Sequence, residues 1–203
     1  WQIIDEPPIL FRHLSHMKPQ DEPTKGRKGA LDEFLTLANL QGNDLMMFKI
    51  LLVTDLIPGL SHPGVTISGQ QGSAKSMTVR LEKMLIDPSE IPLTRLVKDE
   101  SEVIRVLDRH HIVCFDNVRD VRDTVSDLLA QATTGAGVAV RRKYTDDEDF
   151  VRRFRRIIRL NGVYSDIKES DLLSRMILFE LAPIPKESRK MEADIWAEFY
   201  RLR

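Results

Sequence analysis

Apolar residues recur along most of this chain in two alternating patterns, one typical of strands and the other of helices. Short β-branched or fully apolar runs predict five strands, at residues 65–67, 92–96, 112–115, 156–160 and 176–181. Apolar residues three or four positions apart predict helices that start near residue 75 and cover 99–108, 118–132 and 166–175. Strands that alternate with helices need right-handed crossovers. The pattern therefore predicts an α/β fold of three layers around a mostly parallel, five-stranded sheet.

The two ends of the chain do not follow this alternation. Residues 1–30 contain four prolines, which indicates a linker or arm that wraps the domain surface. Helices are predicted over 31–40 and 43–57, the second with Asn43 as its N-cap. Residues 187–203 form a helix with one apolar face, which needs a partner, so we expect a C-terminal helical lid to begin there. The expected division is an arm at 1–30, N-terminal helices at 31–60, a core at 61–184 and a truncated lid at 185–203.

Composition and charge restrict the class of protein. With 203 residues, 42% of them hydrophobic and 30% charged, the chain is long and apolar enough for a folded core. Thirty basic and thirty-one acidic residues give a net charge of -1, so any surface for nucleic acid must be local. Cys114 is the single cysteine, which excludes an internal disulfide and fits a cytoplasmic location.

Two further features concern membranes and the ends of the sequence. The longest apolar stretch, at 45–57, carries Lys49 and Asp55 and is shorter than the ~20 residues of a membrane helix, so no membrane partner is expected. The first residue is Trp1 rather than Met, so we expect a piece of a longer polypeptide.

The strongest candidate chemistry lies in the loop after residues 65–67. It is close to the phosphate-loop pattern G-x-x-x-x-G-K-[ST], with Ala74 in place of the last glycine. Its residues are Gly69, Gln70, Gln71, Gly72, Ser73, Ala74, Lys75 and Ser76. In such a loop backbone N–H groups face phosphate oxygens, Lys75 reaches the β and γ phosphates, and Ser76 binds Mg²⁺. The alternative is a glycine-rich turn that only connects strand to helix, but the combination of residues favours ATP and Mg²⁺ as cofactors.

Three residues bear on this interpretation: Ala74, Asp116 and Asn117. Ala74 is compatible with the loop if its φ stays negative, because a methyl group then costs little. The apolar run 112–115 ends at Asp116, which predicts a second metal ligand, although any buried strand can end in Asp. Asn117 follows, and an amide can orient a water molecule but cannot accept its proton. Hydrolysis is therefore expected to be slow or to use Asp116 or another carboxylate.

Residues 69–183 resemble the AAA+ ATPase domain of primase-helicase proteins of phages, viruses and integrative elements, related to superfamily 3 helicases. AAA+ ATPases in general have a glutamate where this chain has Asn117, whereas the closer relatives have the same Asp-Asn pair. The upstream WQIIDEPPILFRH is similar to the region that commonly precedes the domain. The passages that carry the resemblance are SGQQGSAKS (68–76), HIVCFDN (111–117), ATTGAGVAVRRKYTDD (132–147), RRIIRLNG (155–162) and DLLSRMILFELAPI (171–184).

The resemblance implies roles for further residues. Asn161 stands at the sensor 1 position, between the γ-phosphate and the attacking water; without the family it is equally a turn residue before Gly162. Arg175 matches the arginine finger that reaches the ATP of a neighbouring subunit, which implies a homo-oligomeric ring, a hexamer. The alternative for Arg175 is a cation at a helix C-terminus, where the helix dipole favours it.

The resemblance also implies a contact with DNA. Residues 138–147 match the pre-sensor hairpin, which points into the central pore of such helicases. Arg141, Arg142, Lys143 and Tyr144 offer three cations and a stacking surface for single-stranded DNA. The alternative is a solvated hairpin arm. A primase domain is expected elsewhere in the same full-length polypeptide.

These observations predict a P-loop ATPase of AAA+ type, the motor of a replicative helicase or primase-helicase acting on DNA. The alternative is a nucleotide-dependent assembly switch or scaffold of a replication complex, which the missing glutamate keeps open. A P-loop kinase is the second alternative, but the lid motif of such kinases is not visible in the sequence. His110, His111 and Cys114 lack metal-ligand spacing and are expected to be scaffold; Met46 and Met47 are expected in the core.

Overall fold

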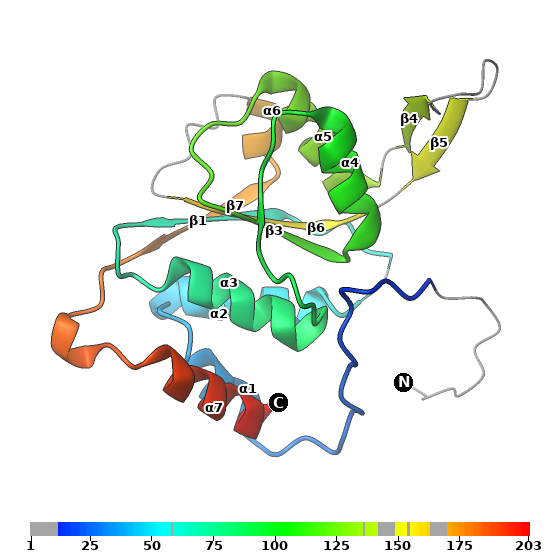
Figure 1. The fold of residues 1–203 in the computed structure, drawn as a ribbon. Coiled ribbons are helices and arrows are strands. Elements are labelled where there is room, and N and C mark those ends of the chain that lie inside the picture. The colour runs from blue at the N-terminus through cyan, green and yellow to red at the C-terminus, as the bar shows by residue number, and fades with distance from the viewer. Residues whose placement is uncertain (1–11, 58, 136, 142–148, 154, 163–169) are drawn as a thin grey trace.

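The computed structural model describes residues 12–57, 59–135, 137–141, 149–153, 155–162 and 170–203. Its centre is an all-parallel sheet of five strands with helices on both faces (Figure 1). These strands are β1 (Gly64–Gly69), β2 (Thr94–Arg95), β3 (Ile112–Asp116), β6 (Ile157–Asn161) and β7 (Met176–Leu181). A separate antiparallel hairpin consists of β4 (Gly137–Arg141) and β5 (Asp149–Arg153).

The helices form layers above and below the sheet. Figure 1 shows α4, α5 and α6 over one face, α2 and α3 over the other, and α1 and α7 beneath them. Their bounds are α1 (Ala30–Leu35), α2 (Gly42–Thr54), α3 (Lys75–Ile86), α4 (Glu100–Arg109), α5 (Asp123–Thr134), α6 (Ser170–Leu173) and α7 (Glu192–Leu202), with a 3-10 helix at Lys186–Ser188. The predicted three-layer α/β fold is confirmed.

The order of the strands decides where polar residues can meet. The sheet runs β2-β3-β6-β1-β7, so β6 lies between β3 and β1. Because the strands are parallel, the carboxyl ends of β3, β6 and β1 lie side by side at the same end of the sheet. β2 is shorter than predicted, since Pro92 has no N–H to donate to a neighbouring strand.

Alternate residues of the strands enter two hydrophobic clusters, one on each face. On β3, Ile112 and Cys114 join the cluster under α2 and α3, and Val113 and Phe115 join the one under α4 and α5. Successive side chains of a strand point to opposite faces, so a strand covered on both faces is apolar throughout. This arrangement accounts for the continuous apolar run that ends at Asp116.

Helix α2 differs from its prediction in two respects. It begins at Gly42 with Gln41 as its N-cap, so Asn43 lies inside the first turn. Met46 and Met47 are 60% and 41% exposed rather than in the core. The helix is apolar on every side, and only the side that carries Phe48 packs against the sheet.

The ends of other helices also differ from the predictions. The helix predicted over 31–40 ends at Leu35, and the helix predicted over 118–132 begins at Asp123. The backbone of Val118 is drawn away from a helix because its N–H donates to the carbonyl of Asn161 (2.8 Å). The C-terminal helix begins at Glu192, and its apolar face finds a partner in α1, where Phe199 lies against Phe34. Among the described residues, no helix is long and apolar enough to cross a bilayer.

The described part of the N-terminal arm lies along the loop that follows α3. Lys18 donates its N–H to the carbonyl of Pro88 (3.0 Å), and Glu90 donates to that of His16 (2.8 Å). The ring of His16 packs on that of His110, which also faces the Lys83 ammonium at 3.2 Å. Burial and this cation lower the pKa of His110 to about 4. The described part of the arm therefore packs on the loop after α3, and His110 is one of the residues in this contact.

A buried cluster of charges joins α2, α3 and β6. Arg159 of β6 is fully buried and donates from Nη2 to Glu82 of α3 (2.6 Å) and to Asp55, the residue after α2. His62 Nδ1 lies 3.4 Å from the second oxygen of Asp55. Burial raises the pKa of Glu82 to about 7 and that of Asp55 above its usual range, against the opposing charge of Arg159. The guanidinium of Arg159 thus provides the positive charge for both buried carboxylates.

We predict that Arg159→Met lowers the free energy of unfolding by about 3–5 kcal/mol, because it leaves two buried carboxylates without their cation. Arg159→Met combined with Glu82→Gln should recover part of that loss. Urea unfolding measures both. Arg105→Met is the matched control, since Arg105 makes an exposed pair with Glu102 and should matter little. Equal effects of Arg159→Met and Arg105→Met would contradict this account of the cluster.

The backbone at the start of α3 corrects an expectation about Ala74. Its φ is +61°, in the left-handed region, rather than negative. A residue with a Cβ is strained there, whereas glycine is not. The methyl group therefore has a conformational cost at the position where the phosphate-loop pattern has its last glycine.

Ala74→Gly should raise the free energy of unfolding by about 1 kcal/mol, because it removes this strain. The matched control is Ala197→Gly, an exposed position inside α7, which should lower stability by about 1 kcal/mol. Thermal or urea unfolding compares the two. A loss of stability in both variants would show that Ala74 is unstrained.

Candidate functional site

Two glycines shape the loop between β1 and α3. Gly69 has a φ of +146°, and a Cβ there would lie 2.4 Å from the carbonyl oxygen of Leu181. Gly72 has a φ of +82°, and a Cβ there would lie 2.4 Å from the guanidinium of Arg189. Both positions favour glycine because of their positive φ, and Gly69 also requires it for space, since the atom that its Cβ would meet belongs to the backbone. The backbone of the loop is tightly held against the segment that follows β7.

Lys75, the first residue of α3, is turned back over this loop. Its ammonium donates to the carbonyls of Gly69 (2.7 Å) and Gln70 (2.9 Å), and its side chain is half-buried. Burial lowers the pKa of Lys75, and the nearby charge of Asp116 opposes that effect. The Ser73 hydroxyl, buried inside the loop, donates to the Gln70 carbonyl (2.8 Å). The cation is therefore held over the loop by main-chain oxygens.

Three polar side chains meet beside Lys75, at the carboxyl ends of neighbouring strands. Ser76 Oγ donates to Asp116 Oδ1 (3.1 Å). The buried amide of Asn161 donates to Asp116 Oδ1 (2.6 Å) and to Ser76 Oγ (2.9 Å). These residues come from α3, β3 and β6, and the strand order β3-β6-β1 brings these elements side by side. The cluster offers hydroxyl and carboxylate oxygens, the ligand types that Mg²⁺ prefers.

Asn117 follows Asp116 in an uncommon backbone conformation. Its φ is +54°, and its side chain is exposed beside the cluster. The next residue donates its N–H to the carbonyl of Asn161, so the chain turns sharply at Asn117. Strained residues of this kind tend to occur at functional sites.

Arg175 lies away from this cluster. It immediately precedes β7, whose first residue pairs with Gly64, the first residue of β1. Arg175 therefore lies at the amino ends of the strands, whereas Lys75 lies at their carboxyl ends. Its side chain is 35% exposed and donates to Asp171 (3.0 Å). Within one chain, Arg175 and Lys75 thus lie at opposite ends of the strands of the sheet.

The candidate DNA-binding residues fall mostly outside the described part of the chain. Arg141 ends β4, and the hairpin of β4 and β5 projects from the body in Figure 1. The predicted strand that begins at Val138 is present in β4. Arg142, Lys143 and Tyr144 lie outside the described residues.

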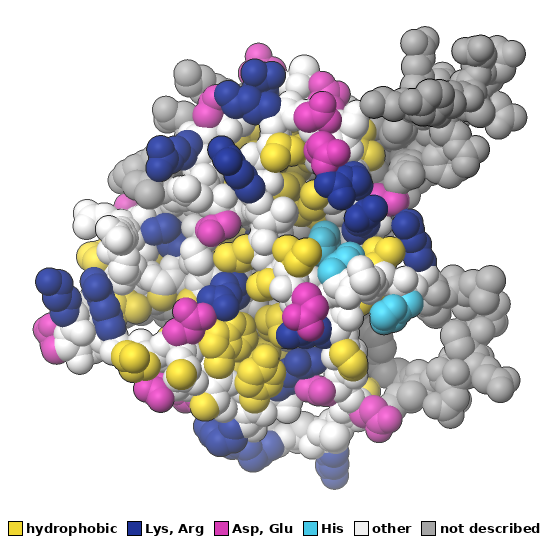
Figure 2. All heavy atoms as spheres, in the orientation of Figure 1, with side chains coloured by type: hydrophobic (Ala, Val, Ile, Leu, Met, Phe, Trp, Pro, Cys, Tyr) yellow, Lys and Arg dark blue, Asp and Glu magenta, His cyan; other side chains and the backbone are white. Residues whose placement is uncertain are grey.

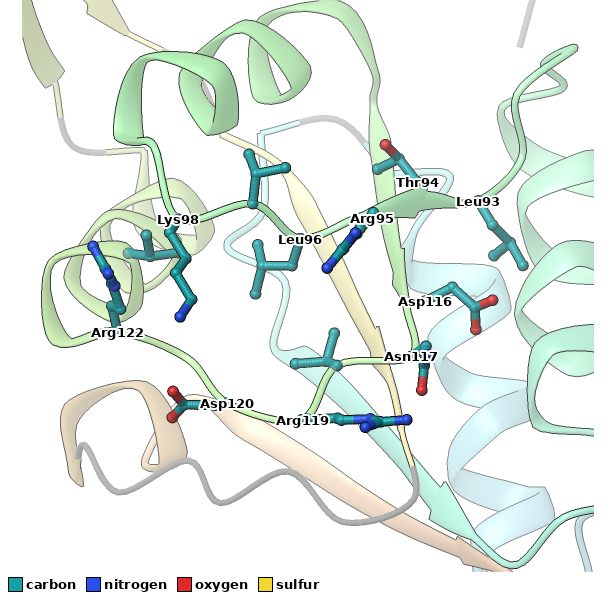
Figure 3. Close-up of a pocket in the computed structure, with 13 residues that line it drawn as sticks. Leu93, Thr94, Arg95, Leu96, Lys98, Asp116, Asn117, Arg119, Asp120 and Arg122 are labelled. Carbon is teal, nitrogen blue, oxygen red and sulfur yellow. The ribbon is translucent and has the colours of Figure 1, made fainter.

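Sequence reasoning missed two sets of residues at this edge. Asn39, after α1, donates its amide to the carbonyls of Ser73 (3.1 Å) and Ala182 (2.7 Å) and so fastens the loop to the segment after β7. A pocket of about 760 Å³ also opens between the ends of β2 and β3, next to Asp116 (Figure 3). No sequence pattern marks Asn39, because it acts through a contact distant in the chain.

Solved structures with a similar fold include the JCV helicase with a small molecule bound and the NrS-1 C-terminal region. The JCV helicase aligns with a TM-score of 0.52 and 15% identity over 85% of this chain and 50% of that one. The apo NrS-1 C-terminal region aligns with a TM-score of 0.55 and 18% identity over 95% of this chain and 47% of that one. The chain spans about half the length of these structures, and at such identities the likeness concerns the fold alone. No curated protein matches the chain in sequence.

A comparison of the sequence with models of protein families identifies the family. The model of the actinomycete integrative conjugative element replication proteins matches residues 31–202, which is most of the chain. The resemblance to proteins of integrative elements is thereby confirmed, and the likeness to the solved helicase structure extends to the fold. The chain belongs to the family of actinomycete integrative conjugative element replication proteins.

Proposed function

We propose that this chain is the ATP-binding and ATP-hydrolysing motor, of AAA+ type, of a replicative helicase or primase-helicase that acts on DNA. The observation that carries the proposal is the mutual hydrogen bonding of Ser76, Asp116 and Asn161 at the carboxyl ends of adjacent strands. In open α/β sheets this edge is where ligands bind. Lys75 and its loop lie directly beside it.

The residues of the loop fit the phosphates of a nucleotide. Gly69 and Gly72 supply the positive φ values that shape the loop, and α3 begins at Lys75, so its N-terminal N–H groups face the loop. Residues 69–76 would hold the phosphate chain of ATP. Lys75 would exchange its main-chain carbonyl partners for phosphate oxygens, a stronger, charge-assisted contact.

The polar cluster fits a magnesium ion. Mg²⁺ in nucleotide sites is held by one or two protein oxygens together with phosphates and water, and Ser76 and Asp116 supply such oxygens. The ion, when bound, neutralises charge on the phosphates. Asn161 donates to both ligands and so orients them, and with Asn117 it would position the attacking water. Neither amide can accept the proton of that water, which leaves this step to a carboxylate such as Asp116.

Arg175 would act between subunits. Its place at the opposite end of the strands from Lys75 supports contact with the nucleotide of a neighbour rather than with that of its own chain. Each subunit then completes the next site, a head-to-tail contact that forms a ring when the rotation between subunits closes. We propose a homo-oligomer, a hexameric ring.

The DNA would run along the β4 and β5 hairpin. Arg141, Arg142, Lys143 and Tyr144 would contact single-stranded DNA through its phosphates and by stacking. The full polypeptide would also carry a primase domain, as the resemblance to primase-helicase proteins implies.

Asn117 favours one alternative function. With an amide in place of a carboxylate, nucleotide could order the subunits without rapid turnover, which describes an assembly switch or scaffold. The two functions differ in steady-state ATP turnover that depends on single-stranded DNA, which only the motor shows.

Lys75→Ala should weaken MgATP binding roughly tenfold to a hundredfold, because it removes charge-assisted bonds worth about 1.5–3 kcal/mol. Fluorescence titration with a labelled ATP analogue measures the affinity. Lys28→Ala, at an exposed position in the arm, is the control and should bind as the parent does. Equal affinity in Lys75→Ala and the parent would rule out the proposed loop.

Arg175→Ala should retain nucleotide binding and lose turnover, by analogy with arginine fingers worth about 10³–10⁵ in rate. Mixed with Lys75→Ala subunits it should recover part of the activity, because some interfaces then combine an intact loop with an intact finger. Asp171→Ala is the control: it breaks the exposed pair with Arg175 and keeps the guanidinium, so turnover should persist. Absence of recovery in subunits that co-assemble would contradict action in trans.

A further inference from the structure

The amide of Asn39 is bonded to two main-chain carbonyls that are distant from it in the sequence. Asn39 belongs to the segment between α1 and α2, where the next residue, Leu40, is buried in the hydrophobic core. Its Nδ2 donates to the carbonyl of Ser73 in the loop at 69–76 (3.1 Å) and to that of Ala182 after β7 (2.7 Å). An amide nitrogen has two hydrogens, and both are used here. Asn39 therefore acts on the backbone of the loop.

The carbonyl of the preceding residue in the loop is held in a similar way. Gly72 accepts a hydrogen bond from the N–H of Ile184 (3.1 Å), in the segment after β7. In a planar trans peptide the carbonyl of one residue and the N–H of the next point in opposite directions. The N–H groups of Ser73 and Ala74 therefore point away from these partners, and neither donates to a protein oxygen of the described residues. Both N–H groups are available to a ligand of the loop.

The peptide between Ser73 and Ala74 is held in a strained conformation. The φ of Ala74 is +61°, which is unfavourable for a residue with a Cβ. Rotation of this peptide by half a turn would reverse its carbonyl and its N–H and bring φ of Ala74 to a negative, unstrained value. The bond from Asn39 opposes that rotation, because the reversed carbonyl no longer faces the amide. Such strain persists only where the surrounding structure over-determines it.

We propose that Asn39 is a positioning residue for the loop at 69–76. By holding the carbonyl of Ser73, it keeps the N–H of Ala74 directed toward a phosphate of the bound nucleotide. Consecutive N–H groups in a turn of this kind bind anions. After rotation of the peptide, the carbonyl oxygen of Ser73 would face the phosphate instead, and this oxygen can only accept hydrogen bonds. The inference rests on the proposed function in taking a phosphate as the ligand.

The direction of a single N–H group is important because the chain has no excess of positive charge. Its net charge is -1, and basic and acidic side chains are interspersed on the face shown in Figure 2. A broad positive field therefore does not draw the nucleotide to the loop. Recognition of its phosphates would depend on Lys75 and on the N–H groups around it. Loss of one of these groups should weaken binding measurably.

The first measurement is the affinity for MgATP, by fluorescence titration with a labelled ATP analogue. Asn39→Ala removes both donors, and Asn39→Leu removes them while filling a similar space. Both variants should bind about tenfold more weakly than the parent, the loss expected for one hydrogen bond to a charged group. The control is Asn43→Ala, the same change at an exposed position in the first turn of α2, which should bind as the parent does.

The second measurement separates positioning from general packing and needs no nucleotide. Ala74→Gly should raise the thermal unfolding midpoint of the parent by about 2–4 °C, because it removes the strain. In the Asn39→Ala background the peptide is free to rotate, so the strain is already relieved. Ala74→Gly should then no longer raise the midpoint. A merely structural role of Asn39 predicts the same rise in both backgrounds.

Three outcomes would overturn the proposal: the same effect of Ala74→Gly in both backgrounds, an Asn39→Leu variant with the MgATP affinity of the parent, or an equal loss of affinity in Asn43→Ala. Failure of the proposed function appears separately, as unchanged MgATP binding in Lys75→Ala. The unfolding comparison still decides in that case whether Asn39 holds the peptide.

Discussion

The structure depends on one buried cation. Arg159 lies between Glu82 and Asp55 with no exposure to solvent, and two carboxylates buried without it would be unfavourable by several kcal/mol each. The same bonds hold α3 and the end of α2 against β6. Arg159 lies two residues before Asn161, and Glu82 lies on the helix that begins with Lys75 and Ser76. The ion cluster therefore fixes the position of α3 relative to β6. This position in turn allows Ser76 to contact Asn161.

Periodicity and motif spacing were enough to predict the five parallel strands, the loop at 69–76 and Asp116 at the end of its strand. They predicted these features because burial on both faces makes such strands continuously apolar, and because glycines mark the loop. Periodicity could not predict that α2 leaves Met46 and Met47 exposed, since a helix that is apolar on every side does not show which side is buried. Nor could it reveal Arg159, because a cation in an apolar strand has meaning only when partners distant in the sequence are known.

The candidate site was predicted in part for the same reasons. Lys75, Ser76, Asp116 and Asn161 meet because they follow adjacent strands. The condition set for Ala74, a negative φ, is not met, since the sign of φ is set by how the loop packs against the segment after β7 rather than by the residue itself. Among the described residues, the non-glycine residues with positive φ are Ala74 and Asn117, and both lie beside this cluster. Strain of this kind is kept where the surrounding structure over-determines it.

The central claim is that the loop at 69–76 and the Ser76, Asp116 and Asn161 cluster together hold a magnesium nucleotide. It is tested most directly by a crystal structure determined with Mg²⁺ and a non-hydrolysable ATP analogue. The account predicts that the Lys75 ammonium leaves the carbonyls of Gly69 and Gln70 for phosphate oxygens, and that an ion lies between Ser76 and Asp116. Nucleotide bound elsewhere, or a loop unchanged at saturating nucleotide with Lys75 still on those carbonyls, would contradict it.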